Sequence, residues 1–452
     1  MLKNLIRLSC VLPVMLLAAC NVSSRLDDGS GGSGGDATLT ADRSSYLVGE
    51  VATLTPKFTG KVARIDPGLG AVTSGVAVKT PALRDNTEYK LVVGTGADAK
   101  TISLTLQVRF RNSYRVLDQT FAVSQHAAVA LADGSVLVSG GSRGLSILST
   151  AINRFDPVSQ GWTQLGVLNN GRSEHQMTLL ASGKLLITGG NLNLAGGAAA
   201  ELFDPTTGIS LVQGAMLAQR LHHTATLLNS GKVLITGGST GEGFPGGTSN
   251  TAELWDPATQ SFTPTVNTMT TARANHNATL LSDGKVLITG GYNSWGTVQY
   301  AELYDPLTNK FSPLAGGPAA LPALQTAAAR PDGSVWLLGG ENQQSTAGVR
   351  IAYQYLPSTG ALSARSDIPL AQSAAASVVL GNGDVLMFGG YLDATAITNQ
   401  AQRIGANDGS TLANMPSARL GHTATRLPDG RVLIVGGQNG TGTLQSNVLV
   451  YE

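Results

Sequence analysis

A nine-residue stretch, Asp283 to Gly291, recurs along the chain and limits what the chain can fold into. It reads Asp-Gly-Lys-Val-Leu-Ile-Thr-Gly-Gly: a tight turn, an apolar strand and a pair of glycines. Seven such pairs begin at Gly140, Gly189, Gly237, Gly290, Gly339, Gly389 and Gly436, at spacings of 49, 48, 53, 49, 50 and 47 residues. A unit of roughly 50 residues made of short strands cannot bury its own apolar faces. The sequence therefore predicts repeats that pack on one another.

Each repeat is written as four short strands. The first, such as Ala278 to Leu281, leads into a two-residue turn of the Asp-Gly, Asn-Gly or Ser-Gly kind. Asp-Gly and Asn-Gly suit a type I′ hairpin, whose twist matches the strands on either side. The second strand ends in the glycine pair, and the third ends in Asp-Pro, as at Tyr304-Asp305-Pro306. The fourth begins at an aromatic residue, such as Trp162 or Phe311. This order predicts antiparallel four-stranded units.

The last repeat stops after its third strand, at Val448 to Glu452. Asn112 to Asp118 precede the first repeat at the spacing of a fourth strand, so we expect them to complete the last unit. Such closure removes an open sheet edge. Chain direction then predicts that Phe110 lies closer to the turn Asp429-Gly430 than to Gln438-Asn439, on the face opposite the variable loops.

These repeats resemble those of kelch β-propellers, including the propeller of galactose oxidase, over Asn112 to Glu452. The resemblance implies an all-β chain whose residues 111–452 form a seven-bladed propeller. Galactose oxidase uses a copper radical centre with a cysteine crosslinked to a tyrosine. The chain has two cysteines, Cys10 and Cys20, so no cysteine follows Cys20 and that chemistry is excluded. The periplasmic sialic acid mutarotases are also kelch proteins, but they have six blades and their catalytic residues find no match here.

The motif Arg-x-x-His opens four repeats. It occurs at Arg172/His175, Arg220/His223, Arg273/His276 and Arg419/His422, and His126 stands at the same position in the first repeat. Gln325 and Ala375 replace the histidine in the other two repeats. A residue that recurs at a fixed offset more often serves the fold, so these side chains are expected to fix the links between repeats. The alternative is a ring of cationic donors near a channel mouth, suited to a carboxylate or sulfate. His222 and His223 are adjacent and are expected to point to opposite sides of a strand.

Length variation is concentrated in the loops after the glycine pairs, at 191–198, 239–250, 292–299 and 391–399. Variable loops on a rigid scaffold are where binding sites are usually built. Phe244, Tyr292, Trp295 and Tyr391 lie in these loops and are candidates for stacking on sugar rings, or for packing over the rims of the sheets. No acid pair or nucleophile–base pair stands out. One histidine per repeat is unsuited to a zinc site, so neither a metal nor another cofactor is expected.

The first 35 residues read as an export signal and a tether. Lys3 and Arg7 precede an apolar run, Val11 to Leu17, and small residues before Cys20. This pattern is too short for a membrane span and is typical of a signal peptide. Leu17-Ala18-Ala19-Cys20 resembles the lipobox of bacterial lipoproteins, which implies a signal at 1–19, lipidation of Cys20 and, with Asn21 next, the outer membrane. An ordinary signal peptide or an uncleaved anchor is the alternative. Residues 20–35 then form a Gly/Ser-rich tether.

From residue 36 to residue 110 apolar and polar residues alternate, as at Thr101 to Val108. Period-two patterning with turns between runs predicts an antiparallel sandwich. The segment resembles the Ig-like modules that bacterial surface proteins use as spacers. The whole chain has 30 basic and 29 acidic residues and no basic stripe, so nucleic acid is not an expected partner.

The sequence thus favours an exported, lipid-anchored binding or adhesion module whose variable-loop face binds a glycan or a surface protein. An enzyme acting on sugar acids, similar to a mutarotase or epimerase, is the first alternative. It predicts a deep pocket in which a carboxylate and several arginines converge. A scaffold within an envelope assembly is the second alternative and predicts a flat apolar patch without a pocket.

Overall fold

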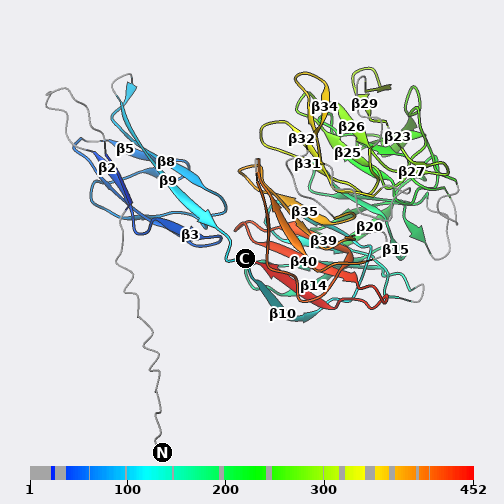
Figure 1. The fold of residues 1–452 in the computed structure, drawn as a ribbon, viewed down its shortest axis with the longest axis horizontal. Coiled ribbons are helices and arrows are strands. Elements are labelled where there is room, and N and C mark those ends of the chain that lie inside the picture. The colour runs from blue at the N-terminus through cyan, green and yellow to red at the C-terminus, as the bar shows by residue number, and fades with distance from the viewer. Residues whose placement is uncertain are drawn as a thin grey trace, which may run out of the picture. The chain divides into compact units, whose positions relative to one another are not determined.

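The chain is described by a computed structural model that covers residues 22–25, 37–60, 62–96, 99–144, 147–192, 198–240, 247–298, 300–314, 321–341, 352–365, 372–392, 396–406 and 408–452. The chain divides into two compact units, Met1–Arg109 and Phe110–Glu452. In these residues the regular elements are all β-strands (Figure 1). None of them belongs to a helix of the length and apolarity that a membrane span requires.

The first unit contains two sheets that share one core. One sheet has the order β1-β2-β4-β7 and the other β3-β9-β8-β5-β6. The strands are β1 (Val22–Arg25), β2 (Thr38–Ala41), β3 (Ser45–Leu47), β4 (Thr53–Lys57), β5 (Ala63–Asp66), β6 (Gly70–Ala71), β7 (Val78–Lys79), β8 (Thr87–Val93) and β9 (Lys100–Arg109). In β9 the alternating residues Ile102, Leu104 and Leu106 are buried, and they share a core with Leu39 and Leu54 of the other sheet. β1 lies within the segment 20–35 that was expected to be a tether, and it pairs with β2.

The second unit is built from antiparallel four-stranded sheets, seven of them among the described residues. In chain order they are β11 (Ala127–Ala130), β12 (Val136–Ser139), β13 (Ala151–Phe155) and β14 (Trp162–Val167); β16 (Gln176–Leu179), β17 (Leu185–Thr188), β19 (Ala200–Asp204) and β20 (Ile209–Val212); β21 (Thr224–Leu227), β22 (Val233–Thr236), β23 (Ala252–Asp256) and β24 (Ser261–Pro264); β25 (Asn277–Leu280), β26 (Val286–Thr289), β29 (Glu302–Asp305) and β30 (Lys310–Pro313); β31 (Thr326–Ala329), β32 (Val335–Leu338), β33 (Ala352–Leu356) and β34 (Ala361–Arg365); β35 (Ala376–Val379), β36 (Val385–Phe388), β37 (Ala401–Ile404) and β38 (Gly409–Thr411); and β39 (Leu420–Arg426), β40 (Val432–Gln438), β41 (Asn447–Tyr451) and β10 (Tyr114–Thr120). Two short pairs, β15 (Arg172–Ser173) with β18 (Asn191–Leu192) and β27 (Tyr292–Asn293) with β28 (Gly296–Thr297), lie beside them.

The first three residues of the second strand are apolar in each sheet because both faces of the strand are covered. In β26, Val286 and Ile288 pack on the preceding sheet, against residues such as Leu234. Leu287 points the other way and packs on the following sheet, against residues such as Leu337. Full burial of one such side chain contributes roughly 1.5–3 kcal/mol. The run Val-Leu-Ile therefore joins each sheet to both of its neighbours.

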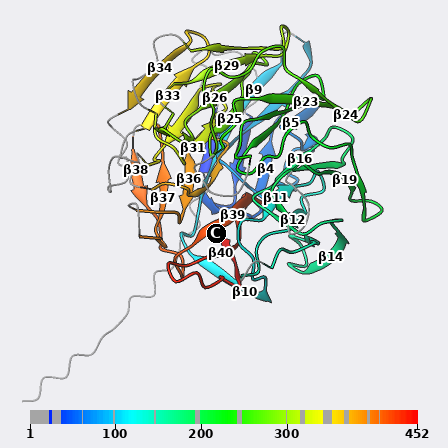
Figure 2. The same cartoon turned by 90° about the vertical axis from the view of Figure 1, so that its right-hand side faces the viewer.

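Seven hydrophobic clusters each bridge two neighbouring sheets, and one of them joins the last sheet to the first. In that cluster Leu433 and Val450 of the last sheet pack on Val136 and Phe155 of the first. Figure 2 shows the strands following one another around a centre, from β14 through β24 and β34 to β38. The second unit therefore has no exposed sheet face at either end of the series.

The closing sheet is confirmed to take its fourth strand from the start of the unit. β10 pairs with β41, with Tyr114 opposite Tyr451, and covers the expected segment shifted by about two residues. Tyr451 in turn lies opposite Val432, just after the Asp429-Gly430 turn. Phe110 stacks on Tyr451 with ring centroids 5.2 Å apart. The second unit therefore starts at the Asp-Gly end of this sheet, as chain direction predicts.

Candidate functional site

The glycine pairs exist because the link into the next sheet lies directly on them. A Cβ atom on Gly189 would come within 2.4 Å of the Arg220 carbonyl oxygen and 2.7 Å of His223 Cε1, both from the next sheet. The N–H of Gly190 donates a hydrogen bond of 2.9 Å to the same Arg220 carbonyl. Both glycines also have positive φ angles, 61° and 93°, which other residues rarely adopt. The pair thus presses each Arg-x-x-His link against the preceding sheet.

The arginines of the motif are buried in ion pairs inside their own sheets. Arg220 Nε donates to Glu253 Oε1 at 2.8 Å, and its Nη1 donates to the Gly237 and Thr251 carbonyls at 2.6 and 3.1 Å. Arg172 and Arg273 pair with Glu201 and Glu302 through Nη2 instead of Nε. All three side chains are at most 1% exposed. They brace the strand ends of each sheet and do not reach a surface.

Sequence analysis missed the glutamates that pair with these arginines. Glu201, Glu253 and Glu302 each stand in an Ala-Glu-Leu tripeptide just before the aromatic-Asp-Pro signal of the third strand. This acidic residue, repeated within an otherwise apolar strand, is the sequence signal that could have revealed the ion pairs. A buried carboxylate requires a partner, and an arginine recurred once per repeat.

Arg419 differs from the other three because its sheet has Leu449 where they have a glutamate. Arg419 Nη1 donates to the Gly436 carbonyl at 2.9 Å. Its Nε and Nη2 atoms have no hydrogen-bond partner among the described residues, although the side chain is fully buried. Burial, partly offset by the nearby Tyr114, lowers the pKa of Arg419 to about 10. This arginine is held by packing and backbone carbonyls.

The recurring histidines are neutral spacers between sheets. They are His126, His175, His223, His276 and His422, each at most 7% exposed. Nε2 of His175 lies 2.8 Å from Ser139 Oγ of the preceding sheet, and Nε2 of His223 lies 2.9 Å from Thr188 Oγ1. Burial lowers the pKa of His126 to about 4 and those of His223 and His422 to about 3. At neutral pH these side chains carry no charge that could attract an anion.

The residue before each of these histidines, and before Gln325 and Ala375 at the same place in the other two sheets, has a left-handed backbone, and together these residues form a ring. These seven residues are Gln125, Glu174, His222, Asn275, Leu324, Ala374 and Gly421, with φ between 51° and 65°. Backbone hydrogen bonds join them: Glu174 N–H donates to the Gln125 carbonyl at 2.9 Å and Asn275 N–H to that of His222 at 3.0 Å. Non-glycine residues in this conformation cost of order 1–3 kcal/mol each and are often found at functional sites. We name these seven residues the mouth ring.

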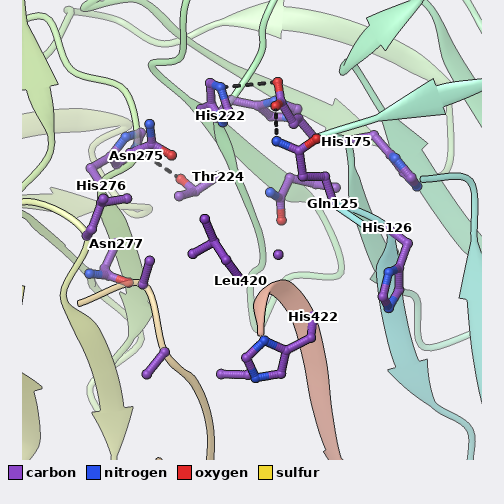
Figure 3. Close-up of a pocket in the computed structure, with 18 of the residues that line it drawn as sticks. Gln125, His126, His175, His222, Thr224, Asn275, His276, Asn277, Leu420 and His422 are labelled. Atoms are coloured by element: carbon purple, nitrogen blue, oxygen red, sulfur yellow. Dashed lines mark hydrogen bonds and ion pairs between the residues drawn. The ribbon is translucent and has the colours of Figure 1, made fainter. Parts of the chain in front are cut away.

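The mouth ring is polar on one side and apolar on the other. Four consecutive sheets contribute Gln125, Glu174, His222 and Asn275, and the next three contribute leucine, alanine and glycine. Gln125 Nε2 donates to Glu174 Oε1 at 2.6 Å, and His222 Nε2 lies 3.1 Å from Glu174 Oε2 (Figure 3). The carboxylate is therefore held in one orientation by an amide on one side and an imidazole on the other.

A cavity of about 660 Å³ opens at the mouth ring. Beneath the ring its wall includes the five histidines, and at its edge it reaches Tyr391 and Gln438, which follow two of the glycine pairs. The volume suits a small ligand, since ligand pockets typically measure roughly 300–1,000 Å³. Among the described residues that line it, Glu174 is the one carboxylate, and there is no lysine or arginine.

Of the predicted site residues, the cavity collects the histidines and Tyr391, while the arginines of the motif lie outside its wall. The expectation that His222 and His223 point to opposite sides of a strand is wrong. His222 has a φ of 53° and lies outside any strand, and both residues line the cavity. Sequence analysis passed over the mouth ring because its members differ in every repeat. The sequence signal for the mouth ring was a position whose residue varies from repeat to repeat, directly before the position of the recurring histidine.

The loop aromatics lie in different environments. Tyr292 is buried, and its hydroxyl donates to Glu341 Oε1 on the neighbouring sheet. Trp295 is 93% exposed. Phe244 lies outside the described residues. Within the described ranges, no group of three or more histidine, cysteine, aspartate or glutamate residues could hold a metal ion.

Comparison with known proteins identifies the kind of fold. A family model for the Kelch motif matches residues 273–318, which span one repeat. The chain is similar to a fungal alcohol oxidase of the AA5 family solved in complex with copper, with a TM-score of 0.60 and 14% identity over 75% of this chain and 76% of that chain. YjhT matches at 14% identity over 74% of this chain and 95% of its own, with a TM-score of 0.46. Curated protein sequences gave no match. The motif and the shared fold support a kelch β-propeller.

Proposed function

We propose that the second unit is a binding module that takes a glycan into the cavity at the mouth ring. The asymmetry of the ring carries this proposal. A position that serves the fold keeps its residue from repeat to repeat, as the neighbouring histidine does in five sheets. The mouth ring instead places an amide, a carboxylate, an imidazole and a second amide on one arc. Such groups accept from and donate to hydroxyls, and the neutral wall opposite them offers an apolar surface.

The alternative of an enzyme that acts on sugar acids fits this cavity less well. That function requires arginines that converge on a carboxylate-bearing substrate. In this chain Arg172, Arg220 and Arg273 are each neutralised by a buried glutamate within their own sheet. The pocket itself argues against a scaffold with a flat apolar face. A glycan-binding module is the function that the site supports best.

The proposal is tested by filling the cavity. Ala376 lines the cavity at the start of β35, so an Ala376→Phe variant places a ring inside it. We expect wild type to bind at least one immobilised glycan on an array and Ala376→Phe to lose that binding by at least about tenfold. Ala258→Phe, at an exposed turn on the Asp-Pro side, is the matched control and should bind like wild type. Equal binding by wild type and Ala376→Phe would refute the site.

We further propose that residues 111–452 form a seven-bladed kelch propeller, that residues 36–110 form an Ig-like spacer and that the chain is exported and lipid-anchored through Cys20 to the outer membrane. The seven sheets in a closed series and the two-sheet core of the first unit support the architecture. The lipobox-like Leu17-Ala18-Ala19-Cys20 supports the anchor. Cys20→Ala should move the protein from the membrane fraction to the soluble fraction. A membrane-bound Cys20→Ala, with no labelled fatty acid on the wild type, would contradict the anchor.

A further inference from the structure

We infer that the ligand of the mouth-ring cavity is an amino sugar, a pyranose that carries a primary ammonium group. This inference rests on the proposed glycan-binding function and specifies its ligand. It follows from the charge, the hydrogen-bonding groups and the apolar wall of the cavity.

Charge is the first step. Glu174 is the one carboxylate on the described wall of the cavity, and no lysine or arginine lies on that wall. Burial lowers the pKa of His126 to about 4 and keeps the other four buried histidines neutral as well at pH 7. The motif arginines, which could have reversed the sign, are outside the wall. The Glu174 carboxylate, which His222 contacts at 3.1 Å, is therefore the one acidic group that the described wall offers a cation, and that wall offers an anion no lysine or arginine.

The second step is the exposure of the carboxylate. The Glu174 side chain is 17% exposed, so its charge is only partly screened by water. Gln125 contacts one oxygen of the Glu174 carboxylate and His222 contacts the other. A carboxylate can accept about four hydrogen bonds. Oxygen lone pairs thus remain for a donor from the ligand. An ammonium group has three donors and would form charge-assisted hydrogen bonds there.

The third step concerns the rest of the cavity, because an amine without a sugar ring would contact only the part near Glu174. Asn275 lies beside His222 on the polar arc, within the same cavity. Asn277 also lines the cavity with a polar side chain. Leu420 and Tyr391 lie on the wall as apolar surface for the C–H face of a sugar ring. Hydroxyls and an apolar face are what a pyranose adds to an amine.

The experiment compares ligands that differ in one group. The full-length protein is titrated calorimetrically at neutral pH with methyl β-glycosides of glucosamine, glucose, N-acetylglucosamine and glucuronic acid, and with n-butylamine. We expect glucosamine to bind roughly 10–100-fold more tightly than glucose and N-acetylglucosamine, and glucuronate to bind most weakly of the sugars. n-Butylamine should bind at least tenfold more weakly than glucosamine.

Glu174→Gln keeps the shape of the side chain and removes its charge. In this variant the preference for glucosamine over glucose should fall to less than about threefold. Glu88→Gln removes one negative charge from an exposed site in the first unit and should keep the wild-type preference. A thermal melt of each variant establishes that it is folded.

The possible failures are distinguishable. If none of the pyranoses binds and the glycan array is also negative, the proposed function itself is wrong. If glucose binds as tightly as glucosamine, or glucuronate binds more tightly, the glycan site stands and the amino-sugar inference is overturned. If n-butylamine equals glucosamine, the cavity recognises a plain amine and the inference is likewise overturned. A preference for glucosamine that survives in Glu174→Gln would also overturn it.

Discussion

The histidines next to the mouth ring show how one residue can serve both the fold and the site. Each fills the space that a glycine pair leaves open and bonds through Nε2 to the preceding sheet, as His175 does to Ser139. Because they are buried and neutral, they add no charge to the wall, on which Glu174 and His222 contact each other. Gln325 and Ala375 take this place in the other two sheets, which indicates that the position requires no charge.

These histidines predict that the protein loses stability in mild acid. Burial lowers the pKa of His126 to about 4 and that of His422 to about 3, against 6.5 in the unfolded chain. The unfolded chain therefore binds more protons as the pH falls below about 6.5, and each buried histidine then costs about 1.4 kcal/mol per pH unit. The stability is fully present above that pH and is lost on the way down to the folded-state pKa.

The measurement is the free energy of unfolding in urea at pH 7 and pH 5. His175→Gln, which copies the natural Gln325, should reduce the loss between the two pH values by about 2 kcal/mol. A pH dependence that is unchanged in this variant would show that the histidines do not titrate on unfolding.

At the scale of the strand, the third strand of three sheets contains a buried glutamate within an otherwise apolar sequence. Glu302 is fully buried in β29 and pairs with Arg273 at 2.8 Å. The arginine also donates to the carbonyls of Gly290 and Tyr300, at 3.0 Å each. One side chain thus ties the link, the glycine pair and the third strand together.

Removing one partner of this pair should be costly. Glu302→Gln leaves the Arg273 charge buried without a carboxylate, and we expect a loss of about 3–5 kcal/mol in the free energy of unfolding. The control is Lys184→Met, which breaks an exposed ion pair with Asp204 and should cost less than about 1 kcal/mol. Similar losses in the two variants, measured by urea unfolding, would mean that the buried pair adds no special stability.

The strands and turns could be predicted from sequence because each is encoded locally. Asp283-Gly284 specifies a hairpin, and Val286 to Ile288 can only be a strand covered on both faces. The mouth ring could not be predicted in this way. Leu324 and Ala374 have a left-handed φ that neither residue favours alone, and a backbone hydrogen bond joins them across two sheets. The partner of Arg273 was missed for a related reason, since it lies 29 residues further along the chain.

At the scale of the molecule, the ring of sheets is closed by two segments from opposite ends of the second unit. β10 pairs with β41, and Leu117 joins the core between the last sheet and the first. The spacing of Asn112 to Asp118 from the first repeat was enough to predict this closure. Closure also fixes where the unit begins, because Phe110 stacks on Tyr451 at the Asp-Gly end, while the mouth-ring cavity lies at the other end of the strands.

Deleting Asn112 to Asp118 should therefore destabilise the whole second unit. The last sheet would lose its outer strand and the core would lose the cover that Leu117 gives it. We expect the melting temperature, measured by calorimetry, to fall by roughly 10 °C or more. Deleting Gly29 to Gly35 removes the same number of residues from the predicted tether and should leave the melting temperature unchanged. Equal melting of both variants would contradict closure by β10.

The central claim, that the mouth ring is the binding site, is tested most directly by a crystal structure of the protein with methyl β-glucosaminide. The account predicts one sugar inside the cavity, with its ammonium nitrogen about 2.7–3.0 Å from a Glu174 oxygen and its ring against Leu420 or Tyr391. A sugar seated on exposed Trp295 or on the Asp-Gly turns, with the cavity empty of it, would contradict the claim.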